Sequence, residues 1–498
     1  MQFFLDAHGC AKNQVDAEIL VGILKNRGWE SSELPEHADL IIVNSCGFIE
    51  SAKTESIEAV VTARKAYPKA KVLLAGCLAE RYAEVFQDNL AEADAFFGNG
   101  DLSRLPEILD ALFPASSASA DSPRPVLKPA QRGVCGGSRP DLLSFPRSAY
   151  VKITEGCDNW CSFCAIPLIR GALRSRTIEE VVSECRELVS RGVYELNLIG
   201  QDLAAFGCGS GLESSGEPAA DGQAVPSSGS DADPSKPSPL SRLLSALSAL
   251  PGDFRVRLLY IHPDHFPRDI LPVMAGDPRF LPYFDIPFQS GDDSLIQAMN
   301  RKGSVSGYEK LVQDIRAAFK ASPYGTAVLR TTFLVGFPGE TDEAHQNTAR
   351  FLSSIRSLWS GCFTWSAEEG TRAADLKKKV PKKTAKARME ALQQIQTEIT
   401  PKELQFFLGK KIEVLIEECI PDPPAEAEQA DEDDGIPVSQ THLALGRAWF
   451  QAPEVDGSVV LQYEDASKGK DGAPVAPGSV VEALVIGVNG VDIEALAQ

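Results

Sequence analysis

Residues 1–112 alternate short apolar runs with segments of helical periodicity. Apolar runs of strand length lie within residues 1–10, 38–46 and 70–77, whereas 14–28 and 51–66 repeat apolar residues every three to four positions. Continuous apolar runs are typical of parallel strands buried on both faces, and the segments between them predict crossover helices. This part of the chain is therefore expected to form an N-terminal parallel α/β domain.

The same alternation resumes at residue 147 and continues to residue 378, with six strand candidates separated by helical segments. Six β/α units are fewer than the eight of a closed barrel, so 147–378 is expected to form a partial, TIM-like (β/α)6 barrel. Residues 113–146, rich in Ala, Ser, Pro and Gly, are expected to be a linker. Residues 207–239 are dominated by Ser, Gly, Pro and Ala, which predicts a disordered insertion before the next helix.

The last part of the chain changes character. Residues 379–408 are charged and have helical periodicity, which indicates a helical connection. Residues 409–498 carry short β-type runs with Gly and Pro turns, which predicts a small C-terminal β-barrel interrupted by the acidic loop 422–434. The predicted fold class is α/β, with a parallel N-terminal domain, a partial barrel and a β-barrel module.

Length and composition fit this division. A chain of 498 residues exceeds what one hydrophobic core usually organises, so two or three domains are expected. No run of 18 or more apolar residues is present, and the start "MQFFLDAHGC" lacks the basic and apolar regions of a secretory signal. We therefore expect a cytoplasmic protein without a membrane partner. Eleven cysteines in a reducing compartment suggest metal binding or redox chemistry more than disulfides.

Three of these cysteines lie close together in "TEGCDNWCSFCAIP": Cys157, Cys161 and Cys164. A structural zinc site normally needs four ligands, and a dithiol pair would leave Cys157 unexplained. Three thiolates on a 4Fe-4S cluster leave one iron free to bind a substrate or cofactor. The loop follows a strand candidate, which places it at the carboxyl mouth of the barrel, where such folds carry their chemistry. We interpret the three cysteines as cluster ligands, with zinc and dithiol sites as the alternatives.

A second set of three cysteines is dispersed in sequence. Each of Cys10, Cys46 and Cys77 ends one of the N-terminal strand candidates and has a glycine beside it. Because carboxyl ends of parallel strands meet at one edge, the three thiols are expected to converge and hold a second 4Fe-4S cluster. The alternative is that they are ordinary buried cysteines. We assign no function to the other five cysteines: Cys135, Cys185, Cys208, Cys362 and Cys419.

The Cys-x3-Cys-x2-Cys loop resembles the hallmark of the radical S-adenosylmethionine superfamily. The resemblance implies that the open iron binds S-adenosylmethionine, whose reductive cleavage gives a 5'-deoxyadenosyl radical. It also places Phe163, just before the third cysteine, beside the adenine. Further cofactor candidates lie at barrel strand ends: Gln201, Gln289 and Gly336, whose turn allows close approach. Arg330 could pair with the cofactor carboxylate, with a structural salt bridge as the alternative.

Two three-cysteine sets in one chain resemble the methylthiotransferase family. Its members combine an N-terminal three-cysteine domain, a radical S-adenosylmethionine barrel and a small β-barrel called a TRAM domain. The resemblance extends to "GCAKNQVDAE", "VNSCGFIESAK", "RGALRSR" and "TTFLVGFPGET". It implies that all six cysteines are catalytic, that the barrel cluster makes the radical and that the N-terminal cluster supplies sulfur. An electron donor protein is then required, and nothing demands more than a monomer.

The family acts either on transfer RNA or on the β-carbon of an aspartate in ribosomal protein twelve of the small subunit. Residues 411–498 carry 18 Asp plus Glu and four Lys plus Arg, a formal charge of −14 out of −20 for the chain. Such a surface repels phosphate backbones and suits a basic ribosomal protein, free or in the ribosome, so nucleic acid is not expected to be the direct substrate. "GCAKN", "YFDIP" and "GRAWFQAPEVDG" are similar to the ribosomal-protein branch, whereas "FQSG" is similar to the tRNA branch. The alternatives are a tRNA methylthiotransferase and a non-catalytic iron–sulfur protein.

Overall fold

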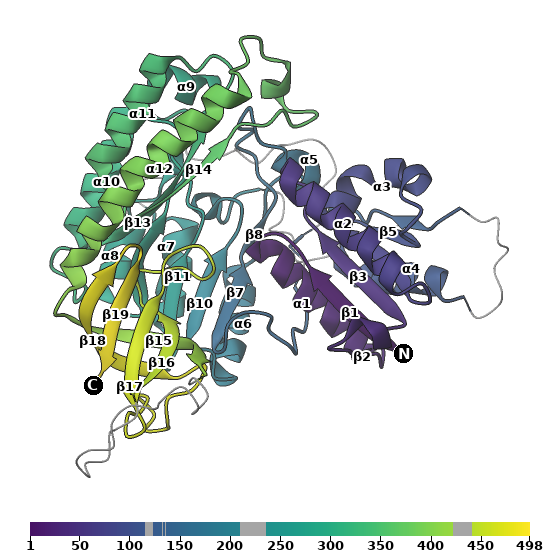
Figure 1. The fold of residues 1–498 in the computed structure, drawn as a ribbon, viewed down its shortest axis with the longest axis horizontal. Coiled ribbons are helices and arrows are strands. Elements are labelled where there is room, and N and C mark those ends of the chain that lie inside the picture. Colours follow the sequence, from purple (N-terminus) through teal and green to yellow (C-terminus); the bar gives the residue numbers. More distant parts are fainter. Residues whose placement is uncertain (115–122, 132, 135, 210–235, 422–440) are drawn as a thin grey trace, which may run out of the picture.

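The structure is a computed structural model, and it describes residues 1–114, 123–131, 133–134, 136–209, 236–421 and 441–498. Three structural units follow one another along the chain (Figure 1). The N-terminal α/β unit packs on one side of a central six-stranded parallel sheet, and a C-terminal β-barrel packs below it. No helix among the described residues is long and apolar enough to cross a membrane.

The N-terminal unit is a six-stranded parallel sheet in the order β2-β1-β3-β4-β5-β6. Its central strands β3 and β4 are buried along nearly their whole length, as their continuous apolar runs predict. The strands are β1 (Gln2–Ala7), β2 (Glu30–Ser31), β3 (Leu40–Ser45), β4 (Lys71–Gly76), β5 (Ala95–Phe97) and β6 (Val126–Leu127), and the helices are α1 (Ala11–Asn26), α2 (Glu50–Ala66), α3 (Cys77–Asn89) and α4 (Leu105–Leu112).

The central unit is an open six-stranded parallel sheet in the order β14-β13-β12-β11-β10-β7. Sequential order with helical crossovers is the arrangement of a barrel that lacks its last two units, so the predicted partial barrel is confirmed. Its strands are β7 (Ser148–Lys152), β10 (Glu195–Ile199), β11 (Arg255–Leu258), β12 (Phe280–Asp285), β13 (Val328–Val335) and β14 (Trp359–Thr364). Its helices are α6 (Ile178–Ser190), α7 (Pro239–Ser248), α8 (Ile270–Gly276), α9 (Asp293–Ala298), α10 (Val305–Phe319) and α11 (Asp342–Ile355).

The cysteine loop of the barrel is bounded by a small antiparallel pair, β8 (Thr154–Glu155) and β9 (Arg174–Ser175), with the short helix α5 (Ile166–Arg170) between them. A long helix, α12 (Lys382–Leu404), then crosses to a closed barrel in the order β15-β16-β17-β19-β18. The strands of this barrel are β15 (Lys411–Ile420), β16 (Thr441–Arg447), β17 (Val459–Glu464), β18 (Val480–Asn489) and β19 (Asp492–Ala497).

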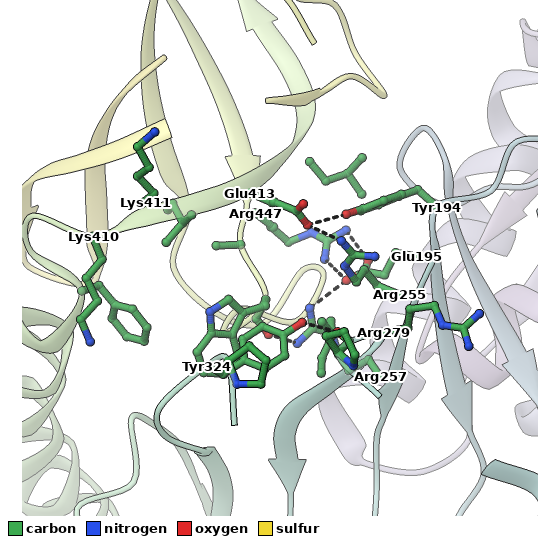
Figure 2. Close-up of a pocket in the computed structure, with 18 of the residues that line it drawn as sticks. Tyr194, Glu195, Arg255, Arg257, Arg279, Tyr324, Lys410, Lys411, Glu413 and Arg447 are labelled. Carbon is green, nitrogen blue, oxygen red and sulfur yellow. Dashed lines mark hydrogen bonds and ion pairs between the residues drawn. The ribbon is translucent and has the colours of Figure 1, made fainter. Parts of the chain in front are cut away.

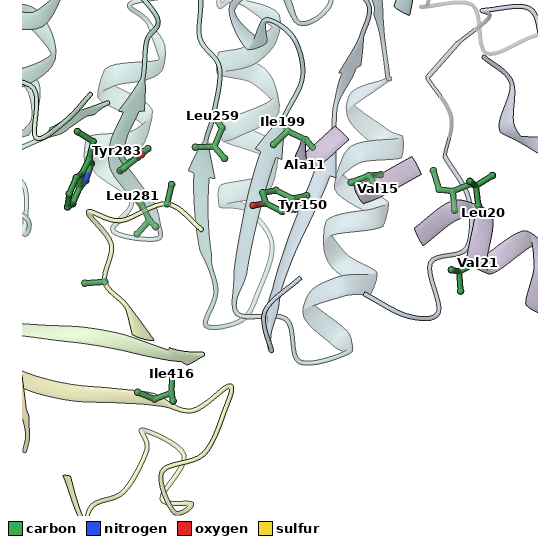
Figure 3. Close-up of a cluster of buried hydrophobic side chains, with 14 of the residues drawn as sticks. Ala11, Val15, Leu20, Val21, Tyr150, Ile199, Leu259, Leu281, Tyr283 and Ile416 are labelled. Atoms are coloured by element: carbon green, nitrogen blue, oxygen red, sulfur yellow. The ribbon is translucent and has the colours of Figure 1, made fainter. Parts of the chain in front are cut away.

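One hydrophobic core joins all three units. Val15 and Leu20 of α1, Tyr150 and Ile199 of the barrel strands, and Ile416 of the C-terminal barrel belong to the same buried cluster (Figure 3). A second core fills the space between the barrel sheet and its outer helices. Because burial of apolar area drives domain association, the N-terminal unit and the C-terminal barrel are held firmly against the central sheet.

The structure differs from the sequence-based expectations in the linker and adds details that the sequence pattern does not predict. Within the stretch expected to be a linker, β6 adds a parallel strand beside β5. Phe450 of the C-terminal unit is fully buried and stacks on Phe407 with ring centroids 3.9 Å apart. Gly156 is needed by the fold itself, since a Cβ there would lie 2.1 Å from the Ala172 carbonyl oxygen. The acidic loop 422–434 and most of the 207–239 insertion lie outside the described residues.

Candidate active site

The barrel cysteines lie in a loop at the carboxyl end of the first barrel strand. The Cys164 amide closes a turn inside this loop by donating to the Cys161 carbonyl at 3.0 Å. Two bonds attach the loop to neighbouring segments: the Ser162 amide donates to Met299 at 3.0 Å, and the Ala373 amide donates to Ser162 at 2.8 Å. Burial raises the pKa of the Cys164 thiol to about 12, and the neighbouring Cys161 thiolate raises it further. Thiols this resistant to ionisation become ligands when a cation compensates the thiolate charge, which suits a metal cluster.

The three N-terminal cysteines converge as predicted. Cys10 follows β1, Cys46 follows β3 and Cys77 begins α3 directly after β4, and these three strands are adjacent in the sheet. A Cβ on Gly9 would lie 3.1 Å from the Cβ of Cys46, and one on Gly47 would lie 2.6 Å from the Cys77 carbonyl oxygen. The glycines therefore allow the three loops to approach one another, and the donor set fits a cluster with three protein ligands.

The electrostatic environment of the N-terminal thiols is mixed. Desolvation opposes ionisation of Cys10, but the cations of Lys12 and Arg170 outweigh it and lower the pKa of that thiol. Burial raises the pKa of Cys46 to about 11, and the thiolates of Cys77 and Cys10 contribute to the rise. Because these cysteines affect one another's ionisation, they form one group.

Neither set is a preformed site for a single ion. Among the residues that the structure describes, no three His, Cys, Asp or Glu side chains converge closely enough to ligate one metal ion. An iron–sulfur cluster places its cysteines on different iron atoms, so its ligands need not point at one centre. The spacing of both sets is thus compatible with clusters.

A buried ion network joins the two cysteine sets. Arg170, six residues after Cys164, donates to the Cys77 sulfur at 3.3 Å and also pairs with Asp16 of α1 at 3.0 Å and Glu155 of β8 at 2.8 Å. Lys152 bridges the same two carboxylates, at 2.5 Å and 2.6 Å. All four ionic side chains are at most 5% exposed. A guanidinium from the segment that follows the barrel cysteines therefore contacts a cysteine of the N-terminal set.

The N-terminal set also faces the barrel interior through Lys12. This buried lysine places its ammonium nitrogen 3.2 Å from the centroid of the Tyr260 ring, just after β11. Such a contact is a strong cation–π interaction when it is desolvated. Lys12 therefore brings the Cys10 loop against the mouth of the barrel.

Four of the five predicted cofactor residues lie at the carboxyl mouth of the barrel, and the fifth lies within a strand. Gln201, Gln289 and Gly336 follow the carboxyl ends of β10, β12 and β13. Phe163 lies within the cysteine loop and packs against a small buried cluster that includes Met299 and Phe337. Gln289 has a φ of 69° and exchanges backbone hydrogen bonds with β13, so its side chain is held at the mouth. Arg330 is the exception: it lies within β13 and pairs with Asp285 at 3.3 Å and Asp456 of the C-terminal unit at 3.4 Å. Cofactor contacts of all five residues stay predictions.

A polar group beside the barrel cysteines was not assigned a role from the sequence, because a lone histidine at a strand end is more often structural than catalytic. His265 contacts the Asp202 carboxylate at 2.6 Å and stacks on His262, with ring centroids 4.9 Å apart. Asn159, inside the cysteine loop, donates to the same carboxylate at 2.8 Å. Burial lowers the pKa of His262 to about 3, with Arg301 contributing, so its ring is neutral. The signal that could have identified this group is the pair of histidines directly after the β11 run "RVRLLYIHPDH".

A cavity of about 470 Å³ lies at the opposite end of the barrel, against the C-terminal unit (Figure 2). Its charged walls are paired: Arg255 with Glu413 at 2.6 Å, and both Arg257 and Arg447 with Glu195 at 2.8 Å. None of the six candidate cysteines lines it. The cavity is thus part of the joint between the barrel and the C-terminal unit.

Comparison with known proteins matches the three units in order. Family models match residues 2–98 (uncharacterized protein family UPF0004), 151–352 (radical SAM superfamily) and 408–497 (TRAM domain). The structure also resembles the radical S-adenosylmethionine methyltransferase TsrM from Kitasatospora setae, with a TM-score of 0.52, 13% identity and coverage of 75% of this chain and 76% of that one. The fold and its cysteine loop define a radical SAM enzyme, which uses a 4Fe-4S cluster and S-adenosylmethionine.

Similar proteins identify the family within the radical SAM enzymes. The chain is 54% identical to a ribosomal protein uS12 methylthiotransferase RimO from Treponema denticola, over 99% of this chain and all of that protein. It is 37% identical to the RimO of Aquifex aeolicus, over 98% of this chain and 96% of that protein. The chain belongs to the RimO family of radical SAM methylthiotransferases. The recognition made from the cysteine sets and motifs is thereby confirmed.

Proposed function

We propose that this enzyme adds a methylthio group to the β-carbon of an aspartate in protein uS12, ribosomal protein twelve of the small subunit. The names of its relatives over the full length support the uS12 substrate. The observation that carries the proposal of two clusters is the Arg170 network: this guanidinium donates to Cys77 of the N-terminal set and pairs with Glu155, two residues before Cys157 of the barrel set. A ribosomal substrate would place the enzyme in the cytoplasm.

The two cysteine sets would have separate roles, one in radical formation and the other in sulfur supply. Cys157, Cys161 and Cys164 would hold a 4Fe-4S cluster, which would supply the one-electron chemistry that cleaves S-adenosylmethionine to a radical. Hydrogen abstraction by a radical is required because a carbon without an acidic proton does not react by acid–base catalysis. Cys10, Cys46 and Cys77 would hold the second cluster, from which the sulfur is delivered.

The protein's own groups prepare this site. Arg170 would fix the orientation of Cys77 through its hydrogen bond to sulfur, and Lys12 would hold the Cys10 loop against Tyr260. Phe163, Gln201, Gln289 and Gly336 would contact the cofactor at the carboxyl ends of the strands. Because these elements are rigid, the distance between radical and sulfur source is set by the fold.

The charge of the C-terminal unit supports a protein substrate over tRNA. Without the loop 422–434 this unit still carries 11 acidic and four basic residues, which favours a basic ribosomal protein and repels a phosphate backbone. A tRNA methylthiotransferase is the second candidate, and the "QSG" at 289–291 is the feature that favours it.

Single cysteine variants test the two-cluster reaction. We expect Cys46→Ala to keep cleaving S-adenosylmethionine to 5'-deoxyadenosine while making no methylthiolated uS12, and Cys161→Ala to lose both activities. Cys419→Ala, a cysteine of the C-terminal barrel outside both sets, is the matched control and should keep both. Methylthiolated product from Cys46→Ala would exclude the N-terminal cysteines as sulfur holders.

A further inference from the structure

A cluster of lysines marks the rim of the barrel mouth. Within 372–386 the chain has seven basic residues and one acidic residue, although the whole protein has a formal charge of −20. The exposed lysines Lys377, Lys378, Lys379, Lys382, Lys383 and Lys386 are called the lysine rim. A local patch of positive charge creates a local potential that attracts negatively charged partners, even on a protein with a negative net charge.

The lysine rim lies beside the radical-forming loop. The Ala373 amide, four residues before Lys377, donates to the carbonyl of Ser162 between two barrel cysteines. Ala373 is fully buried in the same small cluster that Phe163 packs against. The Lys378 carbonyl accepts a hydrogen bond from the amide of Gly339, which lies in the turn that follows β13. A macromolecule whose target residue enters the mouth would therefore meet these lysines.

The lysines are not explained by contacts within the protein. Among the described residues, Lys386 has one weak ion pair with Glu390 at 3.8 Å, and the other five have no ion-pair partner. Lys382 and Lys383 occupy the first turn of α12, where the helix dipole disfavours cations. Acidic side chains would stabilise the start of this helix, so the lysines are not explained by helix stability.

The lysine rim is also separated from the acidic C-terminal unit. It lies at the start of α12, whose 23 residues span about 35 Å, and the far end of this helix contacts the C-terminal barrel (Figure 1). This distance is several Debye lengths at physiological salt, so the two charges do not neutralise one another. The protein thus presents a basic surface at the mouth and an acidic one at the opposite end.

We propose that the lysine rim binds the phosphate backbone of ribosomal RNA next to the target aspartate, so that the preferred substrate is uS12 within the assembled small subunit. This inference rests on the proposed function for its target. A basic ribosomal protein would be repelled by the lysine rim, whereas RNA has the complementary charge. The acidic C-terminal unit would then face away from RNA.

The test compares two triple charge reversals. The test variant carries Lys377→Glu, Lys379→Glu and Lys383→Glu in the rim. The control carries Lys65→Glu, Lys69→Glu and Lys320→Glu, which are exposed lysines without ion pairs elsewhere on the described surface. Both variants change the net charge by the same amount, so a general charge effect would appear in both.

Binding to purified small-subunit ribosomal RNA is measured by filter binding across a salt series. We expect the test variant to bind at least about tenfold more weakly and its salt slope to fall by about two, since each phosphate contact contributes about 0.7–0.9. The control should match the wild type. Unchanged RNA affinity of the test variant would overturn the proposal.

Activity distinguishes the partner. The test variant should lose kcat/KM on assembled small subunits about tenfold or more. It should keep at least the wild-type rate on free uS12, because the repulsion is removed, and the wild-type rate of substrate-free cleavage of S-adenosylmethionine. An equal loss on free uS12 would show that the lysines contact protein, and a loss on subunits with intact RNA binding would assign them to an acidic protein surface; both overturn the proposal. If the wild type modifies neither substrate, the proposed function fails, and the RNA-binding comparison still decides the role of the lysine rim.

Discussion

Arg170 is the residue that anchors the Cys77 loop of the N-terminal cysteine set. Its guanidinium pairs with two buried carboxylates and donates to the Cys77 sulfur, and each of these partners comes from a different element. Buried ion pairs contribute little net stability, but removing one partner leaves an uncompensated charge and costs about 3–5 kcal/mol. The network is therefore sensitive to truncation at its centre.

We expect Arg170→Ala to lower the free energy of unfolding by several kcal/mol and to bind about half the iron of the wild type after reconstitution, because the Cys77 loop loses its anchor. Arg170→Lys keeps the positive charge but lacks the forked guanidinium. Its free energy of unfolding and its iron content should therefore lie between those of the wild type and Arg170→Ala. Chemical denaturation and iron analysis measure these effects. Arg186→Ala, on the exposed face of α6, should match the wild type; full iron content in Arg170→Ala would contradict the anchoring role.

Asp456 gives the protein a pH-dependent stability. Burial raises the pKa of this carboxyl to about 6, although the cation of Arg330 opposes the shift. The folded state then keeps a proton that the unfolded state releases near pH 3.8, so this stabilisation is complete below about pH 4 and is lost as pH rises through about 6.

Asp456→Asn should remove this dependence. We expect the free energy of unfolding of the variant, relative to the wild type, to rise between pH 4 and 7 by on the order of 2–3 kcal/mol. Denaturant titrations at several pH values measure the difference. Asp88→Asn, an exposed residue of α3, should leave the wild-type profile unchanged. A constant difference between Asp456→Asn and the wild type would show that the carboxyl does not titrate in this range.

At the scale of elements, the ends of β1, β3 and β4 create the N-terminal cysteine group. Gly47→Ala would place a Cβ 2.6 Å from the Cys77 carbonyl oxygen and force the two loops apart. We expect this variant to lose the N-terminal iron and methylthiolation while retaining cleavage of S-adenosylmethionine. Gly276→Ala, where a Cβ meets no atom within 4 Å, is the control. Retained N-terminal iron in Gly47→Ala, shown by iron analysis and spectroscopy, would contradict the crowding argument.

The elements that carry the cysteines could be predicted from sequence because their signals are local. Continuous apolar runs identified β3 and β4, and parallel order then placed Cys46 and Cys77 at one edge. The pairing of Arg170 with Asp16 could not be predicted, since the two residues are 154 positions apart and meet only through domain packing. The two-residue strand β6 was missed for a similar reason: so short a run has no periodicity of its own.

At the scale of the whole molecule, the three units together form and support one candidate active site. The central barrel presents one cysteine set at its mouth, the N-terminal unit brings the second set to the same side, and the C-terminal barrel closes the opposite end of the strands. One continuous core holds these units together, so the two sets keep a fixed relation. The acidic end and the basic mouth then orient the protein toward a substrate that contains both protein and RNA.

The central claim is that this chain methylthiolates an aspartate of uS12. Mass spectrometry of uS12 after incubation with anaerobically reconstituted enzyme, S-adenosylmethionine, sulfide and reductant tests it most directly, with tRNA in a parallel reaction. We predict a mass gain equal to replacement of one hydrogen by SCH3 on a single aspartate, and no change in the tRNA. The same gain on a tRNA base, with none on uS12, would contradict the account and favour the tRNA methylthiotransferase.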